Sequence, residues 1–299
     1  MAALPLPVRD GVGPSCVALP VGDWPTIAEF LVQRFAAIPR ATWAARIEAG
    51  DVVDEHGQRV THARPYQPRL RVYYYRALEA EPVIPFQEQV IHQDAHLLVV
   101  DKPHFLPVTP VGKYVQQSLL VRLKRALGLE HLAPLHRIDR ETAGIVLFSV
   151  LPASRGPYSA LFAERAVHKR YEAIVPWRAG RALPAVRHSR LAPDQHFMRM
   201  AEVAGEPNAE THFEMLEARG GWARLGLSPF TGRRHQLRVH CAALGMPIRN
   251  DAIYPVLLPE GSDDFDHPLQ LLAREISFVD PVTGAERRFT SLRTLTLPA

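Results

Sequence analysis

The sequence predicts an α+β protein whose main domain is a mixed or antiparallel β-sheet, preceded by a small N-terminal unit of two helices and short strands. The chain has 27 prolines among 299 residues. Because proline disrupts helix interiors, this content argues against a helical bundle. Apolar–polar alternation around glycine turns predicts hairpins, which outnumber the β-α-β units. The helical segments are also too few and too irregularly spaced for an α/β barrel.

Composition indicates a globular protein with a substantial core. Apolar residues make up 47% and charged residues 22%, which excludes a disordered tail, a collagen-like fibre and a disulfide miniature. The formal net charge of +4 fits a polyanionic partner without requiring one. The two cysteines, Cys16 and Cys241, cannot form a disulfide framework and fit a reducing compartment. No apolar run approaches a membrane span and prolines interrupt the apolar start, so we expect a cytoplasmic protein without membrane contact.

The first part of the chain divides in two. Residues 1–22 are rich in Pro, Gly and Ala without periodicity, and we expect a flexible leader. Residues 23–78 predict two short helices, the first capped by Thr26 and the second stopped by Gly50, followed by short strands. The arginines of this unit are Arg34, Arg40, Arg46, Arg59, Arg64, Arg69 and Arg71. Charge pattern alone favours a solvated surface and an RNA-binding surface about equally.

This N-terminal unit resembles the S4 family in the order and length of its elements. The helix-to-strand turn Ile47–Val52, which reads I-E-A-G-D-V, carries the resemblance in sequence. Since S4 modules bind structured RNA, the resemblance implies an RNA-binding module over residues 23–78.

After a proline-containing linker over residues 79–88, residues 89–299 predict the main domain. Continuous apolar runs predict buried strands at 97–100 and 144–150, and alternation predicts strands at 171–175, 210–217, 222–228, 276–279 and 287–290. Helical periodicity with glycine or proline stops predicts helices at 118–127, 158–166 and 234–244. The segments 186–208 and 256–267 are interpreted as loops peculiar to this protein, and their role stays open.

The motifs of nucleotide cofactors and metals are absent from the sequence. We find no G-x-x-x-x-G-K-[ST] loop, no strand-linked G-x-G-x-x-G and no H-E-x-x-H. His235 and His240 are five residues apart and would lie on different helix faces. No G-x-S-x-G elbow is present, and neither cysteine has a local catalytic partner. The sequence therefore offers no loop for the phosphates of a nucleotide cofactor and no recognisable metal-binding motif.

Two charged segments are the candidates for that chemistry. His136–Gly144 reads H-R-I-D-R-E-T-A-G and directly precedes an apolar strand. Such a loop at the mouth of a strand favours a functional site over a core. Thr231–His240 reads T-G-R-R-H-Q-L-R-V-H and places cations at a helix N-terminus, where they oppose the helix dipole unless an anion binds. Charge pattern alone also allows an ordinary solvated turn and a solvated basic helix face.

Together with three further segments, these motifs resemble, in order, those of the RluA-type pseudouridine synthases. The first is similar to H-R-L-D-x-x-T-S-G, Lys169–Ala173 to K-x-Y-x-A, and the second to T-G-R-[ST]-H-Q-[LI]-R-V-H. Ala243–Ile248 and Leu271–Phe278 continue the series, which spans most of residues 90–289. The resemblance implies an isomerase that breaks the N1–C1′ bond of a uridine in RNA and rejoins the base through C5. It implies ribosomal or transfer RNA as partner, no cofactor and a monomer.

The resemblance also implies roles for individual residues. Asp139 matches the catalytic aspartate, and both attack at C1′ and proton removal at C2′ stay open. Arg238 matches the cation that lies beside the catalytic aspartate. Tyr171 matches the tyrosine that stacks on the uracil and assists proton removal from C5. Arg137 matches the residue that fills the gap left by an extruded base. The other candidate substrate-binding residues are His136, Thr142, Arg233, Arg234, His235 and Gln236.

Two other functions are compatible with parts of this sequence. Glu141 lies two residues from Asp139, which raises a two-carboxylate glycosidase, although close sequence neighbours rarely take the required opposed positions. A non-catalytic RNA-binding protein with the same fold is a second alternative, against which stands the presence of Asp139, Tyr171 and Arg238 together. Taken alone, Tyr171 could be an ordinary sheet residue. Arg233 and Arg234, the adjacent arginines of the second motif, could be phosphate contacts.

Two departures from the family pattern bear on the site. Arg234 stands where Thr or Ser is usual and adds a charge. Ile248–Asp251 reads I-R-N-D where I-x-G-D is usual, so we expect the backbone of that turn to differ.

Overall fold

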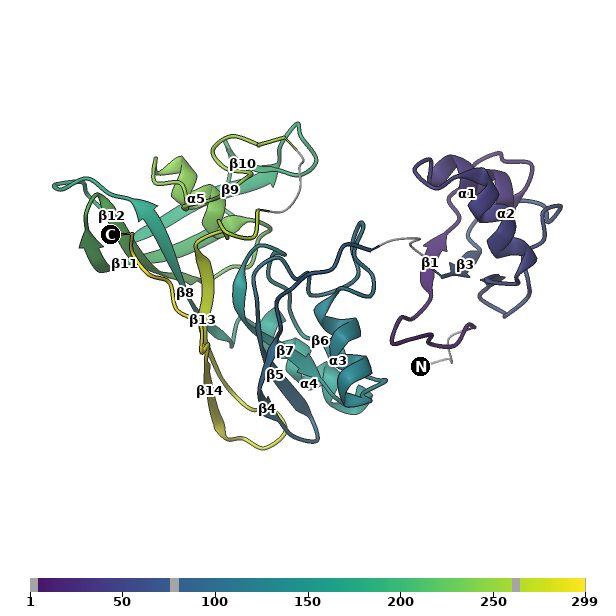
Figure 1. The fold of residues 1–299 in the computed structure, drawn as a ribbon, viewed down its shortest axis with the longest axis horizontal. Coiled ribbons are helices and arrows are strands. Elements are labelled where there is room, and N and C mark those ends of the chain that lie inside the picture. The colour runs from purple at the N-terminus through teal and green to yellow at the C-terminus, as the bar shows by residue number, and fades with distance from the viewer. Residues whose placement is uncertain (1–4, 76–80, 260–263, 299) are drawn as a thin grey trace.

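The computed structural model describes residues 5–75, 81–259 and 264–298. It contains two sheets, one of three strands and one of eleven (Figure 1). The larger sheet has the order β10-β9-β11-β12-β8-β13-β7-β5-β4, with β14 paired to β13 and β6 to β7. All its pairings are antiparallel except the one between β13 and β7. The expected α+β class with a mixed sheet is confirmed.

The N-terminal unit packs two helices on the small sheet. Its elements are β1 (Ser15–Ala18), α1 (Ile27–Arg34), α2 (Arg40–Glu48), β2 (Val52–Asp54) and β3 (Arg71–Tyr74). Thr26 caps α1 by accepting the Glu29 N–H, as expected for a β-region threonine before a helix. Phe30, Trp43 and Tyr74 lie in its core.

Residues 15–18 contradict the expected flexible leader, because β1 pairs with the edge of β3. Val12 also packs against Val115 and Val121 of the main domain. The leader lacks periodicity because its order comes from these distant partners. Residues 1–4 of the expected leader lie outside the described residues.

The expected linker is also only partly a linker. Ile84 is 1% exposed and belongs to the core of the main domain. Arg122 donates hydrogen bonds to the carbonyl oxygens of Ile84 and Phe86, at 2.8 and 2.7 Å. Residues 79 and 80 lie outside the described residues.

The described part of the main domain consists of the strands of the large sheet and three helices. The strands in chain order are β4 (Gln89–Gln93), β5 (Leu97–Lys102), β6 (Ala133–Pro134), β7 (Ala143–Ser149), β8 (His168–Pro176), β9 (Val186–Pro193), β10 (Met200–Val203), β11 (Ala209–Arg219), β12 (Trp222–Pro229), β13 (Leu271–Val279) and β14 (Glu286–Thr290). The helices are α3 (Leu119–Leu127), α4 (Pro152–Ala163) and α5 (Gln236–Ala243).

The apolar runs of β5 and β7 are continuous because both faces of this part of the sheet are covered. Leu98 and Val146 face the cluster that includes Leu119 of α3. Their neighbours Leu97 and Ile145 face the cluster that includes Tyr158 of α4. The other half of the sheet is covered by α5, which packs on β8 and β12.

The segment 186–208 is not the expected loop: β9 and β10 form a hairpin that extends the sheet through β11. Its sequence has only a weak apolar pattern, and Leu191 is buried by contacts with Val239 and Tyr254, which come from distant parts of the chain. Long-range packing therefore creates this strand, and local periodicity does not show it. In the segment 256–267, residues 260–263 lie outside the described residues.

Candidate active site

The loop between β6 and β7 holds Asp139 at the wall of a cavity of about 840 Å³. The backbone N–H of Thr142 donates to the Asp139 carbonyl oxygen at 3.2 Å and closes a turn. The buried ammonium of Lys102 donates to the Arg140 carbonyl oxygen at 3.0 Å and so stabilises the turn. The Asp139 side chain is 28% exposed, so its carboxylate faces the cavity.

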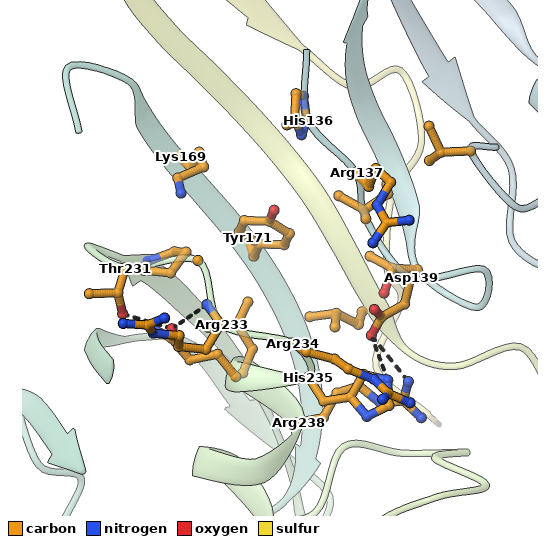
Figure 2. A pocket seen from close by; sticks show the side chains of 18 of the residues that line it. His136, Arg137, Asp139, Lys169, Tyr171, Thr231, Arg233, Arg234, His235 and Arg238 are labelled. Atoms are coloured by element: carbon orange, nitrogen blue, oxygen red, sulfur yellow. Dashed lines mark hydrogen bonds and ion pairs between the residues drawn. The ribbon is translucent and has the colours of Figure 1, made fainter. Parts of the chain in front are cut away.

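Arg238 of α5 joins this aspartate to a second one. Its Nη1 lies 3.2 Å from Asp139 Oδ2 (Figure 2). Its Nε and Nη2 donate to the two carboxylate oxygens of Asp251 at 2.8 and 2.6 Å. Since Arg238 is 1% and Asp251 0% exposed, this is a buried bidentate pair that aims one free edge of the guanidinium at Asp139.

The electrostatics keep this cation charged. Burial alone lowers the pKa of Arg238, but the hydrogen bonds and charges of Asp251, Asp139 and Glu141 outweigh it and raise that pKa above its ordinary value. Arg238 therefore supplies a permanent positive charge that stabilises negative charge on Asp139.

His235 approaches Asp139 from the same side, with its Nε2 3.9 Å from Asp139 Oδ2. It precedes α5 in the left-handed conformation, at φ +54°, so the helix begins two residues later than expected. The Tyr254 hydroxyl accepts the Met200 N–H at 2.7 Å and lies 2.9 Å from His235 Nδ1. Burial, only partly opposed by the charge of Asp139, lowers the pKa of His235, which favours the neutral ring beside the aspartate.

Tyr171, on β8, lines the same cavity as Asp139 and Arg238 (Figure 2). Burial first, and the negative charge of Asp139 second, raise the pKa of Tyr171 above its ordinary value. Its phenol is therefore neutral near pH 7 and presents a ring and a hydroxyl to the cavity. The three residues expected to be catalytic are thus brought together by one loop, one strand and one helix.

The arginines expected to bind substrate take different positions around the cavity. Arg137 is exposed at the cavity wall, and its side chain makes no hydrogen bond or ion pair with the other residues that the structure describes. Arg233 donates from Nε to the Asn208 carbonyl oxygen at 3.0 Å. Arg234 donates from Nη1 and Nη2 to the carbonyl oxygens of Phe197 and Met198, at 3.1 and 2.9 Å.

Gln236 is the clearest departure from the expected substrate contacts. It is 4% exposed, and its amide donates to the Glu210 carbonyl oxygen and the Thr211 hydroxyl, both at 2.9 Å. Its carbonyl oxygen accepts from the Thr231 hydroxyl and the Arg233 N–H. Because all four hydrogen-bonding positions of the amide are occupied, Gln236 shapes the turn before α5, and the structure does not support a direct substrate contact.

His136 also has internal partners, and Thr142 is buried. The His136 ring stacks on Phe162, with centroids 5.0 Å apart, and its Nε2 accepts the Leu147 N–H at 3.1 Å. Burial lowers the pKa of His136 to about 3, so the ring is neutral at pH 7. Thr142 is 2% exposed. These two residues hold the Asp139 loop against β7 more than they offer polar groups to a ligand.

The glycosidase alternative finds no support in the geometry. The Glu141 carboxylate lies 2.9 Å from Arg140 Nε and 3.8 Å from the same Arg238 Nη1 that contacts Asp139. Both carboxylates therefore converge on one cation from one loop, whereas glycoside hydrolysis needs them on opposite sides of a sugar.

Sequence reasoning missed two residues that support the site. Asp251 holds Arg238, and the family-like turn I-R-N-D was the available signal. Asn250 adopts φ +62°, a left-handed conformation that glycine favours and asparagine tolerates, so a glycine-type turn is formed and the expected change of backbone is not needed. Lys102 donates to three carbonyl oxygens, those of Pro103, Leu106 and Arg140, and burial lowers its pKa to about 7. The only local signal for Lys102 in the sequence is the proline that follows it and ends the apolar strand.

Among the described residues, no group of three or more His, Cys, Asp or Glu side chains could hold a metal ion. In the same part of the chain, no helix has the length and apolar character needed to cross a bilayer.

Comparison with solved structures places this fold among the pseudouridylate synthases. The chain superposes on human RNA pseudouridylate synthase domain containing 1 with a TM-score of 0.54, at 23% identity, over 72% of this chain and 94% of that one. Human RNA pseudouridylate synthase domain containing 4 gives a TM-score of 0.52 at 24% identity, over 69% and 88%. The fold of this chain is therefore that of the pseudouridylate synthases of known structure.

Sequence comparison identifies the family within this class. Residues 96–243 match the family model of RNA pseudouridylate synthase. The dual-specificity RNA pseudouridine synthase RluA of Haemophilus influenzae is 35% identical, over 70% of this chain and 94% of its own length. An uncharacterised RNA pseudouridine synthase of Synechocystis is 30% identical, over 76% and 78%. The chain belongs to the RluA-type pseudouridine synthase family.

Proposed function

We propose that this protein isomerises uridine to pseudouridine in structured ribosomal or transfer RNA, with Asp139 as the group that reacts at the ribose. The observation that carries this assignment is the Asp139 carboxylate, open to the cavity and backed by the fully buried Arg238 at 3.2 Å. The N1–C1′ bond breaks, a C5–C1′ bond forms, and the proton on C5 is replaced by one on N1. Atoms and electrons balance without a co-reactant.

The neighbouring groups support the individual steps. The charge of Arg238 stabilises the carboxylate before it reacts, and the buried Asp251 keeps that guanidinium from turning away. The neutral Tyr171 ring offers a face for the uracil, and its hydroxyl is available for proton transfer at C5. Both routes for the aspartate, attack at C1′ and proton removal at C2′, are compatible with this arrangement.

A uridine within folded RNA must leave its stack to reach this cavity, which costs a few kcal/mol. Arg137 is exposed at the cavity wall, and its planar cation can stack in the space the base leaves. We assign it that role.

The N-terminal module adds a second RNA contact in this proposal. Arg40 pairs with Glu29 and Arg64 with Asp54, at 2.7 and 2.5 Å, and Arg46 is 8% exposed. The exposed arginines Arg34, Arg59, Arg69 and Arg71 are therefore the ones we assign to phosphate contacts. We expect the protein to act as a monomer in the cytoplasm.

The deciding experiment compares wild type with Asp139→Asn on unmodified ribosomal and transfer RNA transcripts, followed by pseudouridine mapping. We expect wild type to modify discrete uridines and the variant to lose at least about a thousandfold in rate, because the reacting carboxylate is removed. Asp266→Asn, an exposed aspartate outside the cavity lining, is the matched control and should leave the rate unchanged. Maps without pseudouridine for both proteins would show that the protein is a non-catalytic RNA binder, and equally modified maps would refute the role of Asp139.

A further inference from the structure

Two exposed aromatic side chains lie on segments that border the cavity. Among the Phe, Trp and Tyr residues that the structure describes, only Phe197 and Phe230 are largely exposed, at 76% and 49%. Phe230 lines the cavity, and so does Met198, the neighbour of Phe197. Single exposed apolar residues are ordinary, but here both exposed rings belong to segments that line one cavity.

Phe197 lies at the tip of the β9–β10 hairpin, and its ring stacks on that of His196. Its ring lies 5.1 Å from that of His196, at an interplanar angle of 25°. Both residues are exposed, so the outer face of the Phe197 ring is open to solvent. A pair of planar rings with one free face is the kind of surface on which a nucleobase stacks.

The tip is held in place by side chains of the active site. Arg234 donates to the carbonyl oxygens of Phe197 and Met198 at 3.1 and 2.9 Å. The Met200 N–H donates to the Tyr254 hydroxyl, which lies 2.9 Å from His235 Nδ1. Arg199 donates from Nη2 to the Pro255 carbonyl oxygen at 3.1 Å. Such fixing reduces the entropy lost when a ligand binds the tip.

We propose that the His196–Phe197 pair is a stacking platform for an unpaired nucleobase adjacent to the target uridine, and that Arg234 is the residue that positions it. This inference rests on the proposed function, because the ligand is the RNA whose uridine enters the cavity. It also explains the departure at Arg234. The hydroxyl of a Thr or Ser has one donor and cannot bind two backbone carbonyl oxygens at once, whereas a guanidinium can. Arg234 and the hairpin tip therefore form one structural unit.

The test measures kcat/KM for pseudouridine formation on unmodified transfer and ribosomal RNA transcripts with full-length variants. Phe197→Ala should lower kcat/KM by about tenfold or more, the scale that removal of one base-stacking ring produces. Phe197→Tyr and Phe197→Trp should stay within about twofold of wild type, because both keep a planar ring. Val203→Ala, which removes an exposed apolar side chain from β10 of the same hairpin, is the control and should have no effect.

Arg234 is tested by Arg234→Lys. A phosphate contact would survive this change in large part, whereas a positioning role through two carbonyl oxygens would be lost together with the fork of donors. We therefore expect Arg234→Lys to lower kcat/KM about as much as Phe197→Ala, and the double variant to be little worse than either single one.

A second measurement separates this inference from the proposed function. Ultraviolet cross-linking of the same transcripts to the Asp139→Asn protein should place an RNA adduct on the peptide with residues 194–199, and Phe197→Ala should remove it. If the wild-type protein makes no pseudouridine but the adduct still depends on Phe197, the platform is supported and only the proposed catalysis is refuted. An unchanged kcat/KM in Phe197→Ala, or equal losses in Phe197→Ala and Phe197→Tyr, would overturn the platform while leaving the catalysis intact.

Discussion

At the scale of single residues, the site depends on how one arginine is shared. Arg238 gives two donors to Asp251 and one to Asp139, an arrangement that only the planar fork of a guanidinium can make. A lysine would carry the same charge but could not be fixed by one carboxylate while facing another. The direction of the cation is therefore as important as its charge.

Asp251→Asn tests this positioning. The amide places an N–H₂ group against a buried guanidinium and removes the compensating charge, so we expect the free energy of unfolding to fall by about 3–5 kcal/mol. Activity should fall as well, through kcat more than KM, because Arg238 is no longer aimed at Asp139. Chemical denaturation and steady-state kinetics measure the two effects, and Asp264→Asn, at an exposed aspartate, is the control. A variant with normal stability and normal kcat would show that Asp251 has no positioning role.

At the scale of elements, the junction of β7 and β13 holds the two halves of the sheet together beside the cavity. The parallel pairing consists of Leu272 with Ala143 and Ala273 with Gly144. A Cβ atom on Gly144 would lie 2.2 Å from the Ala273 carbonyl oxygen, and Gly144 has φ +112°. Only glycine fits this close approach of two backbones.

Gly144→Ala should therefore destabilise the protein by about 2–4 kcal/mol, because backbone must move and the residue is strained at positive φ. The matched control is Gly156→Ala. Gly156 lies within α4, where a Cβ meets nothing within 4 Å apart from the adjacent residues. The gain in helix propensity is offset by the following Pro157, so this change should leave stability within about 1 kcal/mol of wild type. Thermal and urea unfolding of both variants measure the difference. Equal stabilities would mean that the β7–β13 contact relaxes freely.

In the platform proposed above, the β9–β10 hairpin is the element that would link the fold to substrate choice. It joins the sheet through β11, and Arg187 pairs with Glu202 across it at 2.5 Å. Since its tip is held by Arg234, the motif that carries Arg238 also places the outermost part of the site. Changes in this hairpin should therefore alter which RNA is bound before they alter the chemistry.

At the scale of the whole molecule, buried neutral histidines couple stability to pH. Burial lowers the pKa of His136 to about 3, and that of His104 and His240 to about 4. Their unfolded values are about 6.5, so the folded state binds fewer protons between these limits. Their contribution to stability is complete above pH 6.5 or so and is lost as the pH falls toward the folded pKa values.

His240→Asn isolates one of these contributions. His240 is fully buried between Ser189 and Thr211. The variant should be less stable at pH 7.5, but its free energy of unfolding should fall less steeply between pH 6.5 and 4.5, by about 1.4 kcal/mol per pH unit. Urea denaturation at several pH values measures the slope, and His56→Asn, at an exposed position, should leave it unchanged. Parallel curves for wild type and His240→Asn would contradict the assignment.

The N-terminal segment contacts both parts of the molecule (Figure 1). Arg9 pairs with Asp51 at 2.8 Å, and the Tyr75 hydroxyl donates to the Pro7 carbonyl oxygen at 2.6 Å. Val12 packs against Val121 of α3. Residues 5–13 therefore tie the module to the main domain, which neither their composition nor their lack of periodicity indicates.

Local signals in the sequence determined the fold class, most strands of the main sheet and the loop and helix that carry Asp139 and Arg238. Burial periodicity and turn residues act over a few positions, and an ordered set of motifs needs no structure to be recognised. The tertiary structure decided what depends on distant partners: the β9–β10 hairpin, the strand in the expected leader, the Asp251 carboxylate behind Arg238, and the buried amide of Gln236. A side chain that satisfies its neighbours and one that faces a ligand can have the same letter in the same motif, because only packing determines which of its hydrogen-bonding groups remain open.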